Sequence, residues 1–219
     1  MLKIELYNED CMELMKRYPD NHFELAIVDP PFGIGNFVQT GGNKRGEIVE
    51  WNNSVPAKEY FTELYRISKN QIIFGANYYN CFHKNGGAIV WIKNQPMPNF
   101  SKAVIASCSF HKKIEIYNET WTNFVAKGRC TEHPCEMPVA LYKWLLSSYA
   151  KQGDKILDTH GGSMSIAIAC HDMGFDLVLS ELDKEYFEAG KSRYETHAKQ
   201  IQLFAPEELN NDPNQMELF

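Results

Sequence analysis

The chain has 219 residues, of which 44% are apolar, and a formal net charge of −6. This size and composition fit one globular domain, and the acidic charge argues against a protein that coats nucleic acid but leaves room for an enzyme with a local basic surface. No apolar run reaches the roughly 18 residues of a bilayer span, and MLKIELYNED lacks the features of a signal peptide. The six cysteines show no disulfide framework. We therefore expect a cytoplasmic protein without membrane attachment.

Strands alternate with helices along most of the chain. Short apolar or alternating runs predict strands, which are LKIEL, FELAIV, QIIFG, AIVWIK, AVIASCSF, KIEIYN, KILD and DLVLS. Amphipathic runs predict helices at residues 10–19, 57–68, 138–150, 165–173 and 183–200. Pro138 and Asp183 are start signals for two of these helices. This order predicts an α/β protein with a Rossmann-like fold, in which a largely parallel twisted sheet carries helices on both faces. The domain is expected to span residues 1–204, and residues 205–219 are expected to be a flexible tail.

The strand FELAIV runs directly into Asp29, Pro30, Pro31 and Phe32. Proline fixes φ and has no N–H, so two successive prolines end a central strand and make its exit rigid. Such an exit presents the Asp29 carboxylate and the Pro30 carbonyl as fixed acceptors beside a flat ring. An ordinary strand-ending turn has the same composition, so this segment alone does not define a function.

A second strand exit lies in KILDTHGGSMSIAIA. The strand leads into a helix through a glycine-rich turn that includes Asp158, Thr159, Gly161, Gly162 and Ser163. Glycines let a ligand approach the backbone, and the next strand ends at Glu181, an acid suited to ribose hydroxyls. The G-x-G-x-x-G pattern of dinucleotide sites is absent, which disfavours a nicotinamide-dependent oxidoreductase. S-adenosylmethionine, a nucleoside without a diphosphate, fits these residues better.

VDPPFGIG and ILDTHGGSMSIA resemble the two signature motifs of the amino-group DNA methyltransferases, which have a Rossmann-like methyltransferase fold. The catalytic motif precedes the cofactor motif, which resembles the beta arrangement of that family. YNEDCMEL resembles the motif that holds the cofactor's adenine, which implies a binding role for Asp10. HPCEMPVALYKWLL resembles the His-Pro helix beside the cofactor's methionine end, which implies one for His133. Asp rather than Ser before Pro-Pro is similar to the adenine-N6 members, phage- and prophage-borne ones included.

The resemblance implies an enzyme that transfers a methyl group from S-adenosylmethionine to the N6 amino group of adenine at specific sites in DNA. Asp29 and Pro30 would accept from the two N–H bonds of the amine, Pro31 would stiffen the exit, and Phe32 would stack on a base flipped out of the duplex. Three alternatives stay open. They are an N4-cytosine methyltransferase, RNA as the substrate, and a catalytically weak or inactive methyltransferase-fold subunit that binds or regulates.

Three positions depart from the family pattern. Met164 stands where a glycine is usual, Thr159-His160 replaces Pro-Phe, and Met137 replaces a lysine before Pro138. The Met164 side chain is expected to crowd the cofactor or to alter the helix entry, which motivates the inactive-subunit alternative.

DNA contacts are expected outside these motifs. Residues 33–56 are rich in glycine and charge and are expected to form a mobile DNA-contacting loop, in which Lys44 and Arg45 meet phosphates. In place of a separate recognition domain the chain has room for a hairpin, KKIEIYNETWTNFVAKGR. Sequence specificity is therefore expected to come from the loop, from this hairpin or from a second subunit in a homodimer.

The tail ends in QMELF, in which Gln215, Leu218 and Phe219 resemble the short peptides by which bacterial DNA enzymes attach to the replication sliding clamp. Large apolar residues on a flexible tail often mark a partner site. A tail that folds back onto the domain, or a chance match, is the alternative.

Cys130, His133 and Cys135 are metal-ligating residue types close together in the sequence. Structural zinc sites use four such ligands, and here the spacing is cramped and no fourth ligand is evident. We therefore expect no metal.

Overall fold

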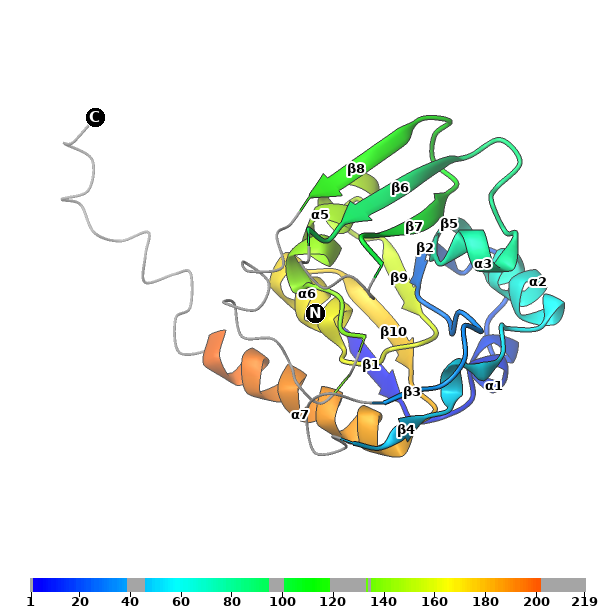
Figure 1. Cartoon of the computed structure of the whole chain (residues 1–219). Coiled ribbons are helices and arrows are strands. Elements are labelled where there is room, and N and C mark those ends of the chain that lie inside the picture. The colour runs from blue at the N-terminus through cyan, green and yellow to red at the C-terminus, as the bar shows by residue number, and fades with distance from the viewer. Residues whose placement is uncertain (1, 39–45, 95–100, 119–132, 134, 202–219) are drawn as a thin grey trace, which may run out of the picture.

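The computed structural model describes residues 2–38, 46–94, 101–118, 133 and 135–201. In this part of the chain eight strands form one sheet in the order β1-β10-β9-β2-β5-β7-β6-β8 (Figure 1). Its strands are β1 (Ile4–Tyr7), β2 (Phe23–Val28), β5 (Ser68–Phe74), β6 (Gly87–Ile92), β7 (Ala103–Cys108), β8 (Ile114–Asn118), β9 (Lys155–Asp158) and β10 (Asp176–Ser180). The helices are α1 (Cys11–Lys16), α2 (Lys58–Ile67), α3 (Ala76–Tyr79), α5 (Val139–Tyr149), α6 (Ser165–Met173) and α7 (Lys184–Ile201). Within the described residues, no helix is long and apolar enough to cross a membrane.

The sheet is parallel except at β7, which runs antiparallel to both β5 and β6. The prediction of a largely parallel sheet is therefore confirmed. β1, β10, β9, β2 and β5 all end at one edge, which Figure 1 shows at the lower end of the sheet. Strand order proceeds from β2 to β5 in one direction and from β9 to β10 in the other, so it reverses between β9 and β2. Open α/β sheets bind their ligands outside the carboxyl ends of the strands at such a reversal.

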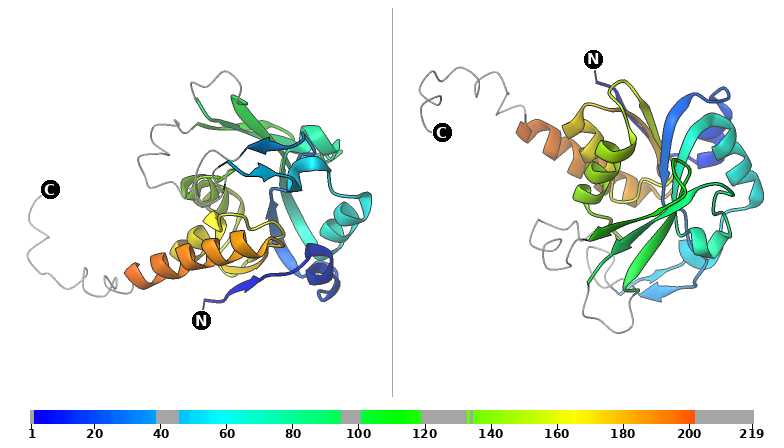
Figure 2. Two further views of the ribbon diagram at one scale, coloured as in Figure 1. Left: turned by 60° about the horizontal axis from the view of Figure 1, so that its bottom comes forward. Right: turned by 90° about the horizontal axis from the view of Figure 1, so that it is seen from above.

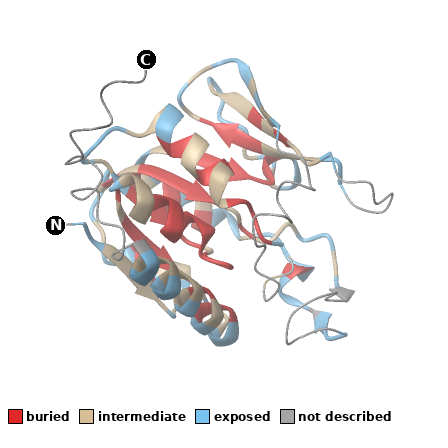
Figure 3. Ribbon diagram, turned by 90° about the vertical axis from the view of Figure 1, so that its left-hand side faces the viewer, coloured by how far each residue is buried: buried red, intermediate tan, exposed pale blue. Residues whose placement is uncertain are grey.

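Helices cover both faces of the sheet (Figure 2). Because successive side chains of a strand point to opposite faces, Leu25 and Ile27 of β2 pack with α5, α6 and α7, whereas Ala26 and Val28 pack with α1 and α2. Figure 3 shows the sheet and the inner sides of the helices buried, with exposed residues on the outer sides. This double burial explains why the central strands read as continuous apolar runs.

The helix boundaries follow the signals in the sequence. Helix α5 begins directly after Pro138, as predicted. The Asp183 carboxylate accepts hydrogen bonds from the N–H groups of Glu185 and Tyr186, at 2.8 and 3.0 Å, so its predicted capping of α7 is confirmed. Helix α6 ends at Gly174 in the left-handed conformation, with a φ of 74°.

Segment 33–56 has more local structure than its sequence indicated. It contains an antiparallel pair, β3 (Phe37–Val38) and β4 (Ile48–Val49), and a 3₁₀ turn at Trp51–Asn53. The Asn52 carbonyl accepts from the Gly35 N–H at 3.1 Å, and the Asn52 side chain is buried. Strands of two residues are too short for a readable hydrophobic period, and so this structure is not predictable from the sequence pattern.

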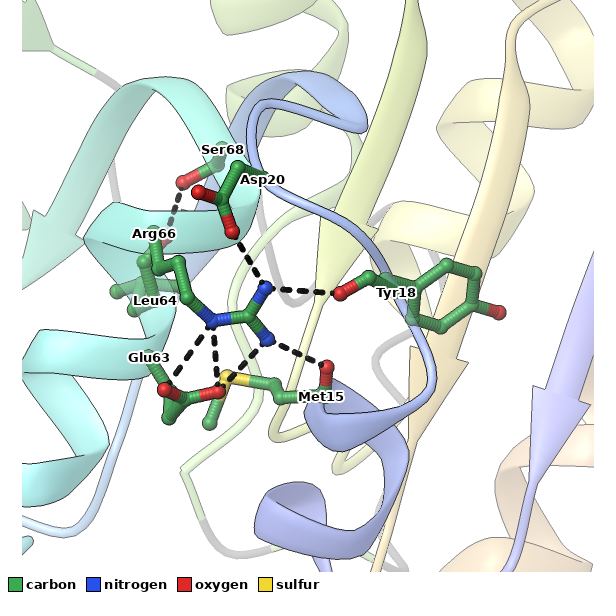
Figure 4. Close-up of polar contacts among 7 residues, drawn as sticks. All are labelled: Met15, Tyr18, Asp20, Glu63, Leu64, Arg66 and Ser68. Atoms are coloured by element: carbon green, nitrogen blue, oxygen red, sulfur yellow. Dashed lines mark hydrogen bonds and ion pairs between the residues drawn. The ribbon is translucent and has the colours of Figure 1, made fainter.

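Arg66 joins the ends of α1 and α2 at the amino-terminal edge of β2 and β5 (Figure 4). Its guanidinium donates to the carbonyls of Tyr18 and Met15, at 2.9 and 3.3 Å. It also pairs with the carboxylates of Asp20 and Glu63, at 2.9 and 2.8 Å. These contacts hold α1 and α2 together at the amino-terminal edge of the sheet. The strand exits at Asp29 and Asp158 lie at the opposite, carboxyl edge.

Candidate active site

A cavity of about 990 Å³ lies at the carboxyl edge of the sheet. Residues from both predicted strand exits line it together with residues from the ends of β1 and β10. The predicted site residues on its wall are Asp10, Asp29, Pro30, Pro31, Phe32, His133, Thr159, Gly161, Gly162, Ser163 and Glu181. Ligand pockets in proteins commonly have volumes of about 300–1,000 Å³, so this cavity is at the upper end of that range and suits two small reactants.

Asp29 lines this cavity, and one of its carboxylate oxygens has no partner among the described residues. Oδ1 is buried and accepts no hydrogen bond from any described residue. Burial raises the pKa of Asp29 to about 7, and the nearby positive charge of Lys93 opposes that rise. A buried polar atom without a partner costs about 1–3 kcal/mol, and such atoms in native structures call for a specific explanation. The strand exit thus holds an acceptor in need of a donor.

The Pro30 carbonyl and the Phe32 ring are less free than the sequence suggested. The Tyr79 hydroxyl of α3 donates to the Pro30 carbonyl and occupies one of its two lone pairs. The Phe32 ring stacks on Tyr78 with the centroids 5.0 Å apart. The Phe32 N–H donates to Asn52 Oδ1 at 2.7 Å, which ties the exit to segment 33–56. The strand exit is therefore fixed by α3 on one side and by the 3₁₀ turn on the other.

Glu181 and His133 fix the glycine turn. The Glu181 carboxylate accepts from the N–H groups of Gly162 and Asp183, each at 2.8 Å. Gly162 has a φ of +50°, and a Cβ atom there would lie 3.1 Å from His133 Nε2. The His133 ring closes over the turn and stacks in turn on Trp51, with the centroids 5.9 Å apart. A glycine is needed at this position because both its backbone conformation and its contact with His133 disfavour a side chain.

Asp158 lies behind the cavity wall and orders the turn that forms part of it. Its side chain is buried, it does not line the cavity, and it accepts from the His160 N–H at 3.0 Å. Burial raises the pKa of Asp158 to about 8. Thr159 Oγ1 lies 2.7 Å from the Tyr60 hydroxyl and 2.9 Å from His160 Nδ1. Thr159 and His160 are on the cavity wall, whereas Asp158 shapes the turn that presents them.

The expectation that the Met164 side chain crowds the cofactor is wrong. Met164 is fully buried in the core cluster that contains α5 and α6, and it does not line the cavity. Its side chain packs toward Gly190 of α7, where an added Cβ would lie 2.8 Å from Met164 Cγ. Its φ of 56° is in the left-handed region that favours glycine, so the departure strains the backbone and leaves the cavity open. Met137, the other departing methionine, does line the cavity.

Lys93 is a cavity residue that the sequence analysis missed. It follows β6, which runs parallel to β5 and so ends at the same edge as the other strand exits. Its ammonium lies 4.9 Å from the centroid of the Trp91 ring. Burial lowers the pKa of Lys93, and the negative charge of Asp29 opposes that change. The sequence signal was available, because a lysine directly after an apolar strand is a strand-exit residue like Asp29.

Arg193 of α7 is a second missed residue. It donates to the Ser163 carbonyl and the Ser165 hydroxyl, both at 2.9 Å, and pairs with the buried Glu136 at 2.8 Å. Glu136 precedes α5 and Ser163 ends the glycine turn, so one guanidinium joins the two segments. No sequence signal identified it, since an arginine on an amphipathic helix is usually a solvated one.

Several predicted contacts lie outside the described residues. They are Lys44, Arg45, Cys130, Gln215, Leu218, Phe219 and the second half of the proposed hairpin. Its first half is β8, which pairs in parallel with β6. In the part of the chain that the structure describes, no group of three or more His, Cys, Asp or Glu side chains could hold a metal ion.

Comparisons with known proteins agree with this geometry. A sequence profile of the DNA methylase family, the N6/N4 methyltransferases, matches residues 106–192. The type II methyltransferase M.HpaI of Haemophilus parainfluenzae is 30% identical over 234 residues, which cover 85% of this chain and 73% of that protein. The crystal structure of the M1.HpyAVI–SAM complex is similar with a TM-score of 0.58 at 19% identity, over 87% of this chain and 99% of that one.

The fold is also that of a cytosine-N4-specific enzyme. The cytosine-N4-specific PvuII DNA methyltransferase is similar with a TM-score of 0.57 at 12% identity, over 91% of this chain and 92% of that one. Likeness at this level confirms the predicted Rossmann-like methyltransferase fold and does not identify the base. Together with the profile, the relationship to M.HpaI confirms a DNA methyltransferase whose cofactor is S-adenosylmethionine. The chain belongs to the N6/N4 family of DNA methylases.

Proposed function

We propose that the chain methylates the N6 amino group of adenine in DNA, with S-adenosylmethionine as the methyl donor. The observation that carries this proposal is Asp29, which lines the same cavity as the glycine turn and has a buried oxygen without a donor among the described residues. An exocyclic amine brings the donor that this oxygen lacks. Aspartate before Pro30 and Pro31 is similar to the adenine-N6 members of the family, and this supports adenine over cytosine.

Asp29 and Pro30 act as a pair of acceptors. An adenine amine is a poor nucleophile because its lone pair is delocalised into the ring. When its N–H bonds donate to the Asp29 carboxylate and to the remaining lone pair of the Pro30 carbonyl, the nitrogen becomes pyramidal and its lone pair localises. Bound S-adenosylmethionine supplies an electrophilic methyl group on a sulfonium. Holding the amine in attack geometry is worth up to about 7–11 kcal/mol of the barrier.

Asp29 also stabilises charge. Positive charge develops on the amine nitrogen as its bond to the methyl carbon forms, and a carboxylate in a poorly solvated cavity stabilises that charge strongly. This role requires the ionised form of Asp29. Lys93 favours that form, since its positive charge lowers the pKa of the buried carboxyl. The sulfur–methyl bond breaks as the nitrogen–methyl bond forms, and the nitrogen then loses its surplus proton to water, so transfer does not require Asp29 to remove a proton beforehand.

Phe32 and Tyr78 provide an aromatic platform on the cavity wall. A base in a duplex cannot enter such a cavity, and extruding it costs a few kcal/mol. Stacking of a base on an aromatic side chain is worth about 1–3 kcal/mol, which offsets much of that cost. The two rings are parallel to within 17°, so a base can continue the same stack.

The residues around the glycine turn fit S-adenosylmethionine. Gly161 and Gly162 keep the turn free of side chains, and Glu181 beside them suits ribose hydroxyls. Asp10 accepts from the Met12 N–H at 2.8 Å through one oxygen and keeps the other for a donor such as the adenine amine. Ser163 and Thr159 add hydroxyls to this wall, and His133 covers the turn on the side expected for the methionine end. Asp158 orders the turn through His160.

Segment 33–56 is the proposed DNA contact. The side chain of Asn52 in this segment bonds the backbone of Phe32, so a movement of the segment on DNA would reach the base platform directly. Lys44 and Arg45 of this segment are proposed to meet phosphates.

The test is to identify the methylated base. DNA from cells that express the chain is digested to nucleosides and analysed by mass spectrometry, with cells that express Asp29→Ala as the control. We expect N6-methyladenine that is absent from the control. N4-methylcytosine in its place would overturn the base assignment, and methylated RNA without methylated DNA would overturn the substrate.

A further inference from the structure

His160 occupies the place where the family has phenylalanine, and it is hydrogen-bonded through a chain that sets its tautomer. The Tyr60 hydroxyl is buried, and within the described residues its partner is Thr159 Oγ1, at 2.7 Å. Thr159 Oγ1 in turn lies 2.9 Å from His160 Nδ1. Each hydroxyl has one proton to donate, so the directions of the two bonds are limited by whether every buried proton finds an acceptor.

Only one direction satisfies all three groups. If Tyr60 donates to Thr159, then Thr159 donates to His160 Nδ1, and every proton has an acceptor. If His160 Nδ1 carried the proton, Thr159 Oγ1 would accept it. Thr159 would then either donate to Tyr60, which leaves the buried Tyr60 proton without an acceptor, or accept from Tyr60 as well, which leaves the buried Thr159 proton without one. A buried donor without a partner pays its full desolvation cost. The chain therefore selects an imidazole with Nδ1 as an acceptor and a proton on Nε2.

The Nε2–H group is not buried and has no partner among the described residues. His160 lines the cavity, and Nε2 is neither a buried orphan atom nor bonded to any described residue. Burial lowers the pKa of His160 to about 4, so the ring is neutral at pH 7. The cavity thus has a neutral donor beside the glycine turn, and a phenylalanine at this position would not supply one.

Asp10 indicates which ligand group this donor meets. Both residues line the same cavity, and the Asp10 charge acts on the His160 ring. A ligand carboxylate is disfavoured there, because Asp10 and Glu181 on the cavity wall are both acidic. The edge of adenine has an amine, which donates, next to a ring nitrogen, which accepts. This pair is complementary to the Asp10 carboxylate, which accepts, and His160 Nε2–H, which donates.

We propose that His160 is a cofactor-recognition residue whose Nε2–H donates to a ring nitrogen of the cofactor's adenine, while Asp10 accepts from the adjacent amine. This inference rests on the proposed function, because it concerns the same cofactor. In this proposal the hydrogen bonds from Tyr60 to Thr159 and from Thr159 to His160 keep the imidazole proton on Nε2, where it can be donated to the cofactor.

The test uses binding and not turnover. S-adenosylhomocysteine and its 1-deaza and 7-deaza analogues, in which one ring nitrogen is replaced by carbon, are titrated calorimetrically into the full chain and into His160→Phe. We expect the wild type to bind one of the two analogues about tenfold more weakly than the parent compound, the usual effect of one lost hydrogen bond. In His160→Phe that discrimination should vanish, with the parent compound bound as weakly as the analogue.

Equal binding of all three compounds by the wild type, or undiminished discrimination in His160→Phe, would overturn the inference. If S-adenosylhomocysteine does not bind the wild type at all, the proposed function fails as well, so the two failures are distinct. A second measurement uses the wild type alone and therefore does not depend on whether the variant folds. Long-range ¹H–¹⁵N correlation should show His160 protonated at Nε2 and bare at Nδ1, and the opposite tautomer would contradict the proposal.

Discussion

Asp29 combines a catalytic requirement with a shifted pKa. Burial raises that pKa from 3.8 to about 7 in the folded protein without substrate. The acceptor role requires the ionised form, so the active fraction rises as the pH passes through about 7. We expect kcat/KM for methyl transfer, which reports the free enzyme, to increase up to that pH and then level off. An acid limb near pH 4, the ordinary carboxyl range, would contradict the burial that we describe.

The contribution of Asp29 to the stability of the fold should decrease over the pH range in which activity increases. Between pH 3.8 and about 7 the folded protein holds a proton on Asp29 that the unfolded chain releases. The contribution of Asp29 to the free energy of unfolding is therefore greatest at low pH and is lost as the pH rises through about 7. Asp29→Asn, which removes this titration, should be less sensitive to pH in urea unfolding over that range.

Lys93 lowers the pKa of Asp29 and so partly opposes the effect of burial. The charged and titratable groups that act on Asp29 or feel its charge are Lys93 after β6, Tyr79 of α3, Tyr142 of α5 and Asp158 of β9. Lys93 is the cation in this set. Lys93→Met should raise the pKa of Asp29 and move the acid limb of kcat/KM to higher pH, whereas Lys93→Arg should restore it in part. Lys102→Met, at an exposed position near the start of β7, is the matched control. An unmoved limb in Lys93→Met would mean that the two charges do not interact.

At the scale of elements, the 3₁₀ turn at Trp51–Asn53 positions the strand exit. The Asn52 side chain satisfies the Phe32 N–H at 2.7 Å. Asn52→Leu has similar size and leaves that N–H without an acceptor, which costs about 1–3 kcal/mol. We expect slower methyl transfer with S-adenosylmethionine affinity within about twofold, as single-turnover rates and calorimetry can show. Asn53→Leu, at the exposed next position, should change neither. Equal effects of both substitutions would mean that the turn matters only through its general stability.

Met164 precedes α6 at a position where the family usually has glycine, and the burial of its side chain compensates for its left-handed backbone. Met164→Gly removes a buried side chain, which costs about 2–5 kcal/mol, and relieves a left-handed backbone, which returns about 1–2 kcal/mol. The free energy of unfolding should therefore fall by up to about 4 kcal/mol in urea titrations. Cofactor affinity should stay the same, because the Met164 side chain packs toward Gly190 and away from the cavity. Tighter cofactor binding in this variant would restore the idea of a crowded turn.

The elements that sequence patterns predicted are those with a strong period. The apolar strands β2, β9 and β10 and the helices α2, α5 and α7 are where they were expected, because buried faces leave a readable spacing. Helix α3 was missed since it has four residues, and the left-handed Gly75 and Asn80 that bound it read as a loop. Asp29 and the glycine turn were visible because proline and glycine constrain the backbone locally. Arg193 and the role of Asn52 depend on contacts between distant segments, and a single sequence does not reveal such contacts. Lys93 was overlooked, although its place directly after the apolar strand β6 could be read from the sequence.

On the scale of the whole molecule, the reversal of strand order between β9 and β2 places the two motifs together. The catalytic exit follows β2 early in the chain, and the glycine turn follows β9 late in the chain, yet both open into one cavity. The order of motifs along the chain does not affect this arrangement, because adjacency in the sheet brings the strand exits together. Helix α7 then ties the second motif to the segment before α5 through Arg193 and Glu136.

The central claim is that one cavity holds the cofactor at the glycine turn and the target amine at Asp29. Purified Asp29→Ala tests it when cofactor binding by calorimetry and methyl transfer in a single turnover on DNA are measured on the same sample. We predict a dissociation constant for S-adenosylmethionine within about twofold of the wild type, because Asp29 faces the amine. Methyl transfer should fall by about 10²–10³-fold or more, the usual loss when one preorganised stabilising group is removed. Transfer at the wild-type rate, or loss of cofactor binding in step with loss of transfer, would contradict the claim.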